Sequence, residues 1–248
     1  MSNLRVFLRW CGTIEAVDPN LYTKVMVPKV PPEDQQRDEL LESDRAEEIL
    51  SYLRQFYYAS IEHIVLALLW ETGMRIGAAK ALDVHDVNLD DRFLSLNHRP
   101  ETGTPLKNGS SGERLVAISP DLTRLLSDHI EYMRNDLTDD AGRKPLLTSQ
   151  VGRLSRSSMR RYIYDVTAPC YVDEECPDCE KDTDARCPEA VTPHAVRRGS
   201  ITHFLTEDVP VDVVGDRMDV SRSILDKHYD RRSEEVKLEQ RRSHLDNI

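Results

Sequence analysis

An arginine and a histidine three positions apart are the side chains of this 248-residue chain that best suit phosphate chemistry. They lie in residues 192–197, TPHAVR, where Thr192 can cap a helix and Pro193 fits its first position. His194 and Arg197 would then share a face near the helix N-terminus, where unbonded backbone N–H groups favour an anion. A surface pair without function has the same spacing, so the motif gains weight only together with other residues.

Two further segments carry side chains of the kinds that phosphoryl transfer uses. In residues 72–77, TGMRIG, a long apolar helix ends at Gly73 and Arg75 emerges at the start of the next helix. In residues 228–230, HYD, Tyr229 ends a predicted helix and can supply a nucleophilic hydroxyl. Each has an ordinary alternative, since Arg75 can cap the preceding helix and Tyr229 can pack with its hydroxyl in water.

A lysine completes the set. Lys107 lies in residues 105–109, PLKNG, within a polar connection between two predicted strands. In chain order, Arg75, Lys107, the HxxR pair and Tyr229 resemble the catalytic residues of the tyrosine recombinase (phage integrase) family, and the match runs over about residues 41–239. The residue types, their order and their spacing agree together, which no single motif could achieve.

This resemblance implies a mainly α (α+β) fold, a helical bundle with a small antiparallel β-sheet, that cuts and rejoins double-stranded DNA at specific sites. It implies that Arg75 and Arg197 hold the non-bridging oxygens of the scissile phosphate, while His194 orients it and handles a proton. Lys107 would protonate the leaving 5′-oxygen, and Tyr229 would form a 3′-phosphotyrosyl bond. Since that bond conserves the energy of the phosphodiester, catalysis needs no cofactor.

The resemblance also implies partners and a location. Active members of the family work as tetramers on paired DNA sites, so we expect a homo-oligomer on DNA. No apolar run approaches the roughly 20 residues that span a bilayer, and the first residues, MSNLRVFLRW, lack the apolar core of a signal peptide. We therefore expect a prokaryotic, cytoplasmic, nucleoid-associated protein without membrane contact.

Three departures from the family pattern leave a second interpretation open. Arg217 stands where the family usually has a histidine or tryptophan, and it joins the candidate catalytic set because arginine also donates to phosphate. Ala78 stands where the family often has an acid. Residues 1–32, one predicted helix over 4–17 and a proline-rich linker, match only the end of the family's N-terminal core-binding domain. A truncated or degenerate integrase would bind DNA without cutting it, and relaxation of the type IB topoisomerase kind would share the chemistry.

Residues 33–248 form the predicted catalytic domain, whose elements follow from hydrophobic periodicity. The predicted helices cover residues 45–57, 61–72, 76–82, 155–166, 193–205, 211–218 and 221–229, and another begins at the Ser119-Pro120-Asp121 cap. The predicted strands cover residues 93–97 and 114–118, so Lys107 would lie on the connection between them.

The formal net charge of −11 argues against a DNA partner at first sight, because phosphate contacts need cations. The charge is unevenly placed, however, since residues 143–164 hold six basic side chains and no acid. The resemblance implies that the helix over 155–166 faces DNA. The predicted DNA-binding residues are therefore Arg153, Arg156, Arg160 and Arg161. A solvated cationic face is the alternative. The abundance of Asp over Lys also resembles a haloarchaeal surface, although ordinary acidic surfaces look similar.

Four cysteines lie close together in an insertion over residues 170–187, with the spacing C-x5-C-x2-C-x7-C. In a reducing compartment this pattern predicts a structural zinc site that fixes a loop beside His194. The predicted ligands are Cys170, Cys176, Cys179 and Cys187. A disulfide or free thiols are the alternatives. Cys11 stands apart and is predicted to pack in the interior.

Overall fold

The computed structural model describes residues 3–26, 39–172 and 187–228, together with Leu238 and Arg242. The chain divides into two compact units, Met1–Asp38 and Glu39–Ile248, and each is described by itself. Among the described residues, no helix is long and apolar enough to cross a membrane.

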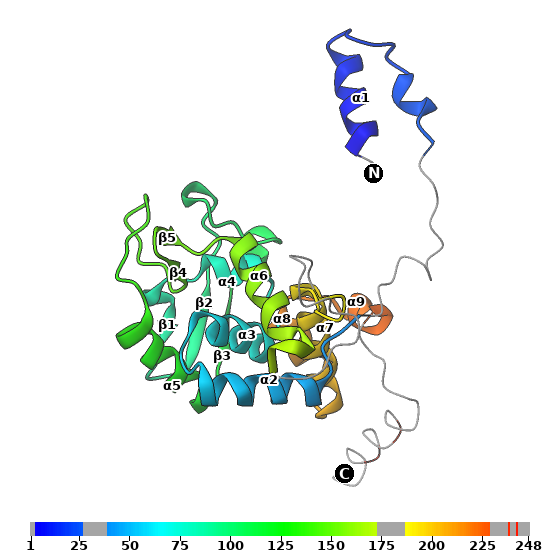
Figure 1. The fold of residues 1–248 in the computed structure, drawn as a ribbon. Coiled ribbons are helices and arrows are strands. Elements are labelled where there is room, and N and C mark those ends of the chain that lie inside the picture. Colours follow the sequence, from blue (N-terminus) through cyan, green and yellow to red (C-terminus); the bar gives the residue numbers. More distant parts are fainter. Residues whose placement is uncertain (1–2, 27–38, 173–186, 229–237, 239–241, 243–248) are drawn as a thin grey trace. The chain divides into compact units, whose positions relative to one another are not determined.

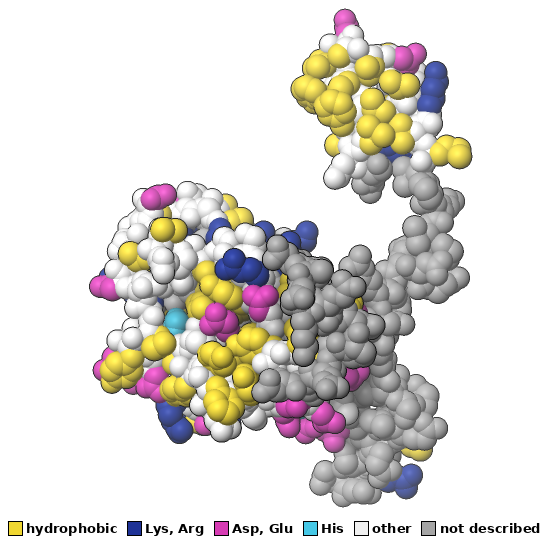
Figure 2. Space-filling model, viewed as in Figure 1, with side chains coloured by type: hydrophobic (Ala, Val, Ile, Leu, Met, Phe, Trp, Pro, Cys, Tyr) yellow, Lys and Arg dark blue, Asp and Glu magenta, His cyan; other side chains and the backbone are white. Residues whose placement is uncertain are grey.

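The first unit is a helix followed by a short 3₁₀ turn. Helix α1 spans Asn3–Thr13, which confirms the predicted helix but ends it earlier than expected, and the turn spans Leu21–Lys24. The two pack together through Arg5, whose Nε donates to the carbonyl of Tyr22 at 3.1 Å. Cys11 is buried between them, as predicted. Figure 2 shows hydrophobic side chains gathered over one face of this unit.

The second unit is built around helix α3, Ile61–Thr72 (Figure 1). Its sequence is apolar on nearly all sides, which is the pattern of a helix enclosed by others. Besides the short helix that follows it in the chain, four helices contact it, and their bounds are α2 Ser43–Phe56, α5 Pro120–Asp128, α6 Arg156–Thr167 and α7 Pro193–Thr206. A mainly helical fold with a small antiparallel sheet is thereby confirmed.

The ends of α3 follow the signals in its sequence. The Ser60 side chain accepts a hydrogen bond from the backbone N–H of His63 at 3.2 Å, so it caps the N-terminus. Gly73 ends the helix in the left-handed conformation with φ +57. A Cβ at Gly73 would lie 2.5 Å from the Met218 sulfur, so both the turn and the packing require glycine. The reversal makes Arg75 the N-cap residue of α4, Ile76–Ala81.

A three-stranded antiparallel sheet lies beside the helices, in the order β1 Val87–Asn88, β2 Phe93–Leu96 and β3 Arg114–Ala117. Leu94 pairs with Val116 in the register, and both side chains are buried. The predicted strands are confirmed, while β1 and the small hairpin of β4 (Thr148–Ser149) and β5 (Gly152–Arg153) were not predicted, because strands of two residues carry no periodicity. The connection between β2 and β3, residues 97–113, holds Lys107; we call it the Lys107 loop.

Two shorter helices follow α7 in the described part of the chain, α8 Val211–Met218 and α9 Arg222–His228. They share a small apolar cluster of fully or almost fully buried side chains, made of Ile201, Leu205, Val214, Met218 and Leu225. Asp219 ends α8 in the left-handed conformation and so sets the direction in which α9 leaves it. Tyr229 follows α9 directly and lies outside the described residues.

One stability prediction comes from His63, which is 2% exposed in the first turn of α3 and whose Nδ1 has no partner among the described residues. Burial, together with the charge of Arg54, lowers its pKa to about 4. An unfolded histidine titrates near 6.5, so below that pH the unfolded chain gains a proton that the native chain refuses. Native stability should therefore fall as the pH drops from about 6.5 to about 4.

Replacing His63→Leu should remove about 2–3 kcal/mol of the stability loss between pH 7 and pH 4.5, since leucine does not titrate. Urea unfolding at the two pH values measures it, with His85→Asn as the control because the His85 side chain is 64% exposed. An equal loss of stability in wild type and His63→Leu would contradict the assignment.

Candidate active site

Two of the predicted catalytic cations face a single cavity of about 390 Å³ beside the Gly73 turn. Its walls come from the start of α4, the Lys107 loop, β3, the start of α6 and the end of α8. The charged side chains that line it are Arg75, Lys107, Arg114, Arg156 and Asp219. Four cations against one carboxylate leave the cavity positive, which suits an anion the size of a phosphate group.

Arg75 reaches the cavity from the N-cap position of α4. Its Nη1 donates to Oδ2 of Asp219 at 2.5 Å, and the Arg75 side chain remains about one-third exposed. No other hydrogen bond to this guanidinium occurs within the described part of the chain. The remaining donors therefore stay available to an anion in the cavity.

Arg197 lies behind the same turn. It is 3% exposed on α7, and its Nη1 donates to the carbonyl of Gly73. Its Nη2 donates to the carbonyl of Asp219 at 3.4 Å. Arg197 thus ties the turn that carries Arg75 to the end of α8, and it adds positive charge close to the cavity.

His194 occupies the first turn of α7, as its motif predicts. Thr192 caps that turn by accepting a hydrogen bond from the backbone N–H of Ala195 at 3.0 Å. Desolvation and the charges of Arg198, Arg197 and Arg75 lower the pKa of His194 below its ordinary value. A neutral imidazole at pH 7 can accept a proton, and the charges of Arg75 and Arg197 both act on it.

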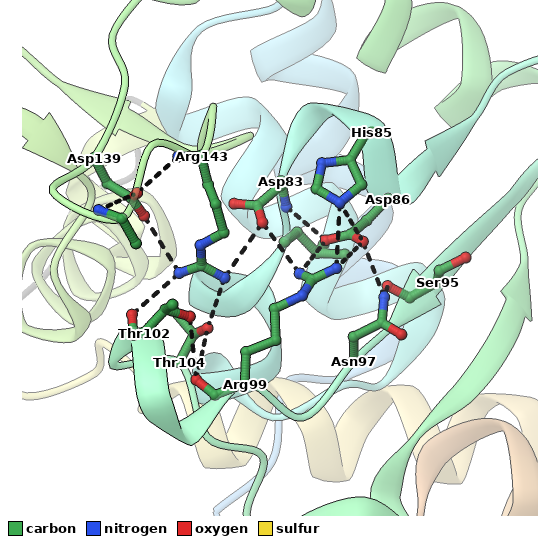
Figure 3. A network of polar contacts seen from close by, with 12 residues as sticks. Asp83, His85, Asp86, Ser95, Asn97, Arg99, Thr102, Thr104, Asp139 and Arg143 are labelled. Atoms are coloured by element: carbon green, nitrogen blue, oxygen red, sulfur yellow. Dashed lines mark hydrogen bonds and ion pairs between the residues drawn. The ribbon is translucent and has the colours of Figure 1, made fainter.

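The Lys107 loop is held at its base by a network of buried ion pairs (Figure 3). Arg99 begins the loop and donates to Asp83 at 3.1 Å and to Asp86 at 2.6 Å, and both of these carboxylates are almost fully buried. Arg143 bonds the loop from the other side, through the Thr104 hydroxyl at 3.0 Å and a backbone carbonyl. We use the name buried ion network for six charged residues, which are Asp83, Asp86, Arg99, Asp139, Arg143 and Arg153.

Arginine contacts determine the ionisation of the network. Burial alone would raise the pKa of Asp86, but hydrogen bonds from Arg99 and from the backbone hold that pKa below its usual value. Similarly, Arg153 and Arg143 outweigh burial and bring the pKa of Asp139 to about 2. Asp83, His85 and Asp86 form the one described group with the spacing of metal ligands. Its two carboxylates are already bonded by arginines, so we interpret the group as part of this network.

Arg153 was predicted to bind DNA, and the structure assigns it differently. Its Nη2 lies 2.5 Å from an oxygen of Asp83 and 2.7 Å from one of Asp139, and it also donates to two backbone carbonyls. Its side chain is only 9% exposed. The expectation for Arg153 is therefore corrected, because a guanidinium so bonded has no donors to spare for a ligand.

The other three arginines of the basic stretch are exposed on α6. Arg156 extends over Gly77 into the cavity, so that a Cβ at Gly77 would lie 3.1 Å from its Nη2. Arg161 lies 5.5 Å from the centre of the Tyr162 ring. Within the described residues no carboxylate pairs with these two or with Arg160. Figure 2 shows Lys and Arg side chains over α6.

Arg217, the sixth predicted catalytic residue, does not line the cavity. Its Nη1 donates to the carbonyl of Ala117 at 2.7 Å and its Nη2 to that of Glu71 at 3.0 Å, while the guanidinium lies 5.3 Å from the Phe204 ring. These contacts hold α8 against β3 and α3. The expectation that Arg217 faces the phosphate is corrected, since both of its terminal nitrogens bond backbone carbonyls and its side chain is not in the cavity wall.

Sequence reasoning missed two residues of the cavity. Arg114 enters from β3, where its Nε donates to the carbonyl of Arg217 at 2.8 Å, and burial lowers its pKa. Asp219 enters from the end of α8. An arginine that opens a strand, and an acid just before a new helix, are weak signals on their own. What distinguishes them is contact with residues more than 100 positions away.

The predicted zinc ligands are only partly described. Cys170 is exposed and Cys187 is partly buried, whereas Cys176 and Cys179 lie outside the described residues. The zinc site stays a prediction from the cysteine spacing.

Comparison with known proteins places this site in context. The model of the phage integrase family matches residues 39–235, which is most of the chain. A comparison with curated protein sequences gives no match.

Similar folds occur among solved structures at low sequence identity. XerA recombinase is 18% identical with a TM-score of 0.60, over 93% of this chain and 73% of that one. The Tn1549 transposon integrase, described in complex with transposon right end DNA, is 16% identical with a TM-score of 0.59, over 91% and 69%. A lambda integrase dimer bound to a COC′ core site is 14% identical with a TM-score of 0.60, over 92% and 57%. At these identities the likeness concerns the fold.

The different environments of Arg153 and Arg160 give a testable contrast. Arg153→Ala should lower the free energy of unfolding by about 2–4 kcal/mol, because it leaves the buried carboxylate of Asp83 short of a partner. Arg160→Ala should leave stability unchanged but should weaken binding to duplex DNA. It should also reduce the slope of the logarithm of the binding constant against the logarithm of salt concentration by about 1. Denaturant unfolding and fluorescence anisotropy at several salt concentrations measure both. The reverse pattern would contradict the two assignments.

Proposed function

The chain belongs to the phage integrase family, and we propose that it cuts and rejoins double-stranded DNA at specific sites through a covalent bond to Tyr229. The observation that carries this proposal is the convergence of Arg75 and Lys107 on one positive cavity, with Arg197 bonded to the turn behind it. Site-specific recombination is the activity of the family, and the residue roles are our assignment.

The cavity is suited to the charge that develops during phosphodiester cleavage. Negative charge spreads over the non-bridging oxygens of the phosphate, and fixed guanidinium groups stabilise it where it appears. Arg75 offers unbonded donors within the cavity, and Arg197 contributes charge while fixing the Gly73 turn. His194, with its lowered pKa, can accept the proton that the tyrosine hydroxyl loses.

The reaction needs no external energy source. The Tyr229 oxygen attacks phosphorus, the bond to the 5′-oxygen breaks, and Lys107 gives that oxygen a proton. A 5′-hydroxyl, from the same or another strand, then attacks the phosphotyrosine. This second step reforms a phosphodiester and returns the proton of the 5′-hydroxyl to Lys107, while His194 gives the released tyrosine oxygen its proton back.

The exposed arginines of α6 extend the positive surface from the cavity. Arg156 lines the cavity, and Arg160 and Arg161 are suited to phosphates or base edges of the flanking duplex. Exchange of strands between two DNA duplexes needs several active sites, so we propose a homo-oligomer, a tetramer, on paired sites. A chromosomal substrate in a prokaryote would place the protein with the nucleoid in the cytoplasm.

Trapping of the covalent intermediate tests the proposal. A duplex with a nick near the cleavage position loses its short 5′-hydroxyl fragment after cleavage, so the protein–DNA adduct accumulates. Wild type should give an adduct on a denaturing gel, and Tyr229→Phe should give none, because phenylalanine has no hydroxyl to attack phosphorus. Since the target site is unknown, the substrates come from a randomised duplex library from which the protein first selects bound sequences.

Two controls separate cutting from binding. Arg75→Ala should retain part of the DNA affinity and lose at least about a hundredfold in adduct formation, whereas Tyr57→Phe, a change at an exposed tyrosine, should keep full activity. Selected DNA that wild type binds but never cuts, at low and at high salt, would instead favour a DNA-binding, catalytically degenerate integrase. An adduct formed by Tyr229→Phe would exclude Tyr229 as the nucleophile.

We also propose a structural zinc ion for the insertion over residues 170–187, on the basis of its four cysteines. Tetrahedral thiolate coordination is the arrangement that structural zinc favours. The ion would fix the segment before α7 and would take no part in the chemistry. Its proposed ligands are Cys170, Cys176, Cys179 and Cys187.

The zinc proposal predicts about one zinc per chain after purification without chelator, measured by elemental analysis. The double variant Cys176→Ser/Cys179→Ser should lose the zinc, because two of four ligands are removed. Cys11→Ser is the matched control, since Cys11 lies in the first unit, and it should keep the zinc. Substoichiometric zinc in wild type, or zinc retained by the double variant, would contradict the site.

A further inference from the structure

Asp219 bonds three parts of the candidate active site at once. Its Oδ2 accepts from Arg75 at 2.5 Å, and its Oδ1 accepts from Nδ2 of Asn108 at 2.8 Å. Asn108 is the neighbour of Lys107 in the loop. The backbone carbonyl of Asp219 accepts from Arg197 at 3.4 Å. One residue therefore links both predicted phosphate-binding arginines to the loop that carries the predicted general acid.

The backbone of Asp219 is held in an uncommon conformation. Its φ of +53 lies in the left-handed region, which side chains other than glycine seldom occupy, although aspartate is among the more tolerant. A glycine would end α8 more easily. The carboxylate is thus present at some conformational cost, and its side chain is only 18% exposed within the cavity wall.

We propose that Asp219 is a positioning residue, which holds Arg75 and the Lys107 loop in the arrangement that binds the scissile phosphate. The inference rests on the proposed function of the cavity. Asp219 occupies a single Nη of Arg75, so the guanidinium is oriented while its other donors point to the cavity. With four cations around it, one carboxylate leaves the cavity positive, so it orients the arginine without neutralising the site.

The alternative is that Asp219 competes with the phosphate, as a carboxylate in the place of the substrate. The geometry favours positioning, because the same carboxylate also bonds Asn108 and would lose two partners if it left. The two roles predict opposite effects. Loss of a competitor raises DNA affinity, whereas loss of a positioning residue slows cleavage and changes affinity little.

The principal test uses Asp219→Gly, which removes the carboxylate and suits the left-handed backbone, so folding is preserved or improved. Single-turnover cleavage of the nicked duplex at saturating protein should slow about 10–100-fold, because small displacements of a catalytic group cost rates of that order. The DNA dissociation constant should stay within about threefold. Asp219→Asn, isosteric and also tolerated at positive φ, should slow cleavage as well.

Asp216→Ala is the matched control, since Asp216 is an exposed acid one turn earlier on the same helix, and it should cleave at the wild-type rate. The double variant Asp219→Gly/Arg75→Ala should lose less than the product of the two single losses, because part of the effect of Asp219 acts through Arg75. A wild-type rate in Asp219→Gly, tighter DNA binding in that variant, or fully additive losses in the double variant would each overturn the proposal.

A readout independent of cleavage separates this inference from the proposed function. The arginine reagent phenylglyoxal should modify Arg75 faster in Asp219→Gly than in wild type, as measured by peptide mass spectrometry, and Asp216→Ala should show no change. Faster modification of Arg75, with no DNA adduct from wild type or any variant, would overturn the proposed function and support the contact between Asp219 and Arg75. Unchanged modification alongside a normal wild-type adduct would overturn the positioning role alone.

Discussion

The turn at Gly73 is the constraint on which the candidate active site depends, because three helices meet at a place where no side chain fits. Helix α3 ends there in the left-handed conformation, the Met218 side chain of α8 fills the space that a Cβ would need, and Arg197 of α7 binds the carbonyl. The turn directs Arg75 into the cavity. A larger residue at this position would strain the left-handed backbone and push against the buried Met218 side chain of α8, the helix that Asp219 ends. Asp219 and the start of α9 are therefore coupled to the same backbone turn as the first arginine.

The Lys107 loop depends on a different physical interaction. The buried ion network joins Asp83, just after α4, to Arg99 at the start of the loop. At the other end of α4, Arg75 lines the same cavity as Lys107. Removing one partner from such a network leaves a buried charge uncompensated, which is why its members are mutually dependent. A long polar loop can carry an exposed lysine at a defined place only when its base is fixed in this way.

Most of the fold could be predicted from the sequence. At the candidate site, the same holds for Arg75, Lys107, His194 and Arg197. Helix caps such as Ser60, Ser119 and Thr192 are local signals, and the structure confirms each of them. The roles of Arg153 and Arg217 could not be predicted, because an arginine looks the same in sequence whether it faces solvent or bonds carbonyls across the core. The Asp83 partner of Arg153 and the Glu71 partner of Arg217 lie 70 and 146 positions away, and two partners of Asp219 lie 144 and 111 positions away. Local patterns carry no information about such pairs.

The net charge of −11 does not set the charge at the cavity, because the charged side chains are unevenly placed. The buried ion network pairs Asp83, Asp86 and Asp139 with Arg99, Arg143 and Arg153, so it is neutral as a whole and the excess of acids belongs to the rest of the chain. Within the cavity the balance is reversed, with four cations and one carboxylate. Because salt screens exposed charges over about 10 Å at 0.1 M, a phosphate in the cavity experiences mainly those nearest groups. An acidic chain can thus hold an anion, provided that its cations are concentrated where the anion binds and its excess acids lie elsewhere.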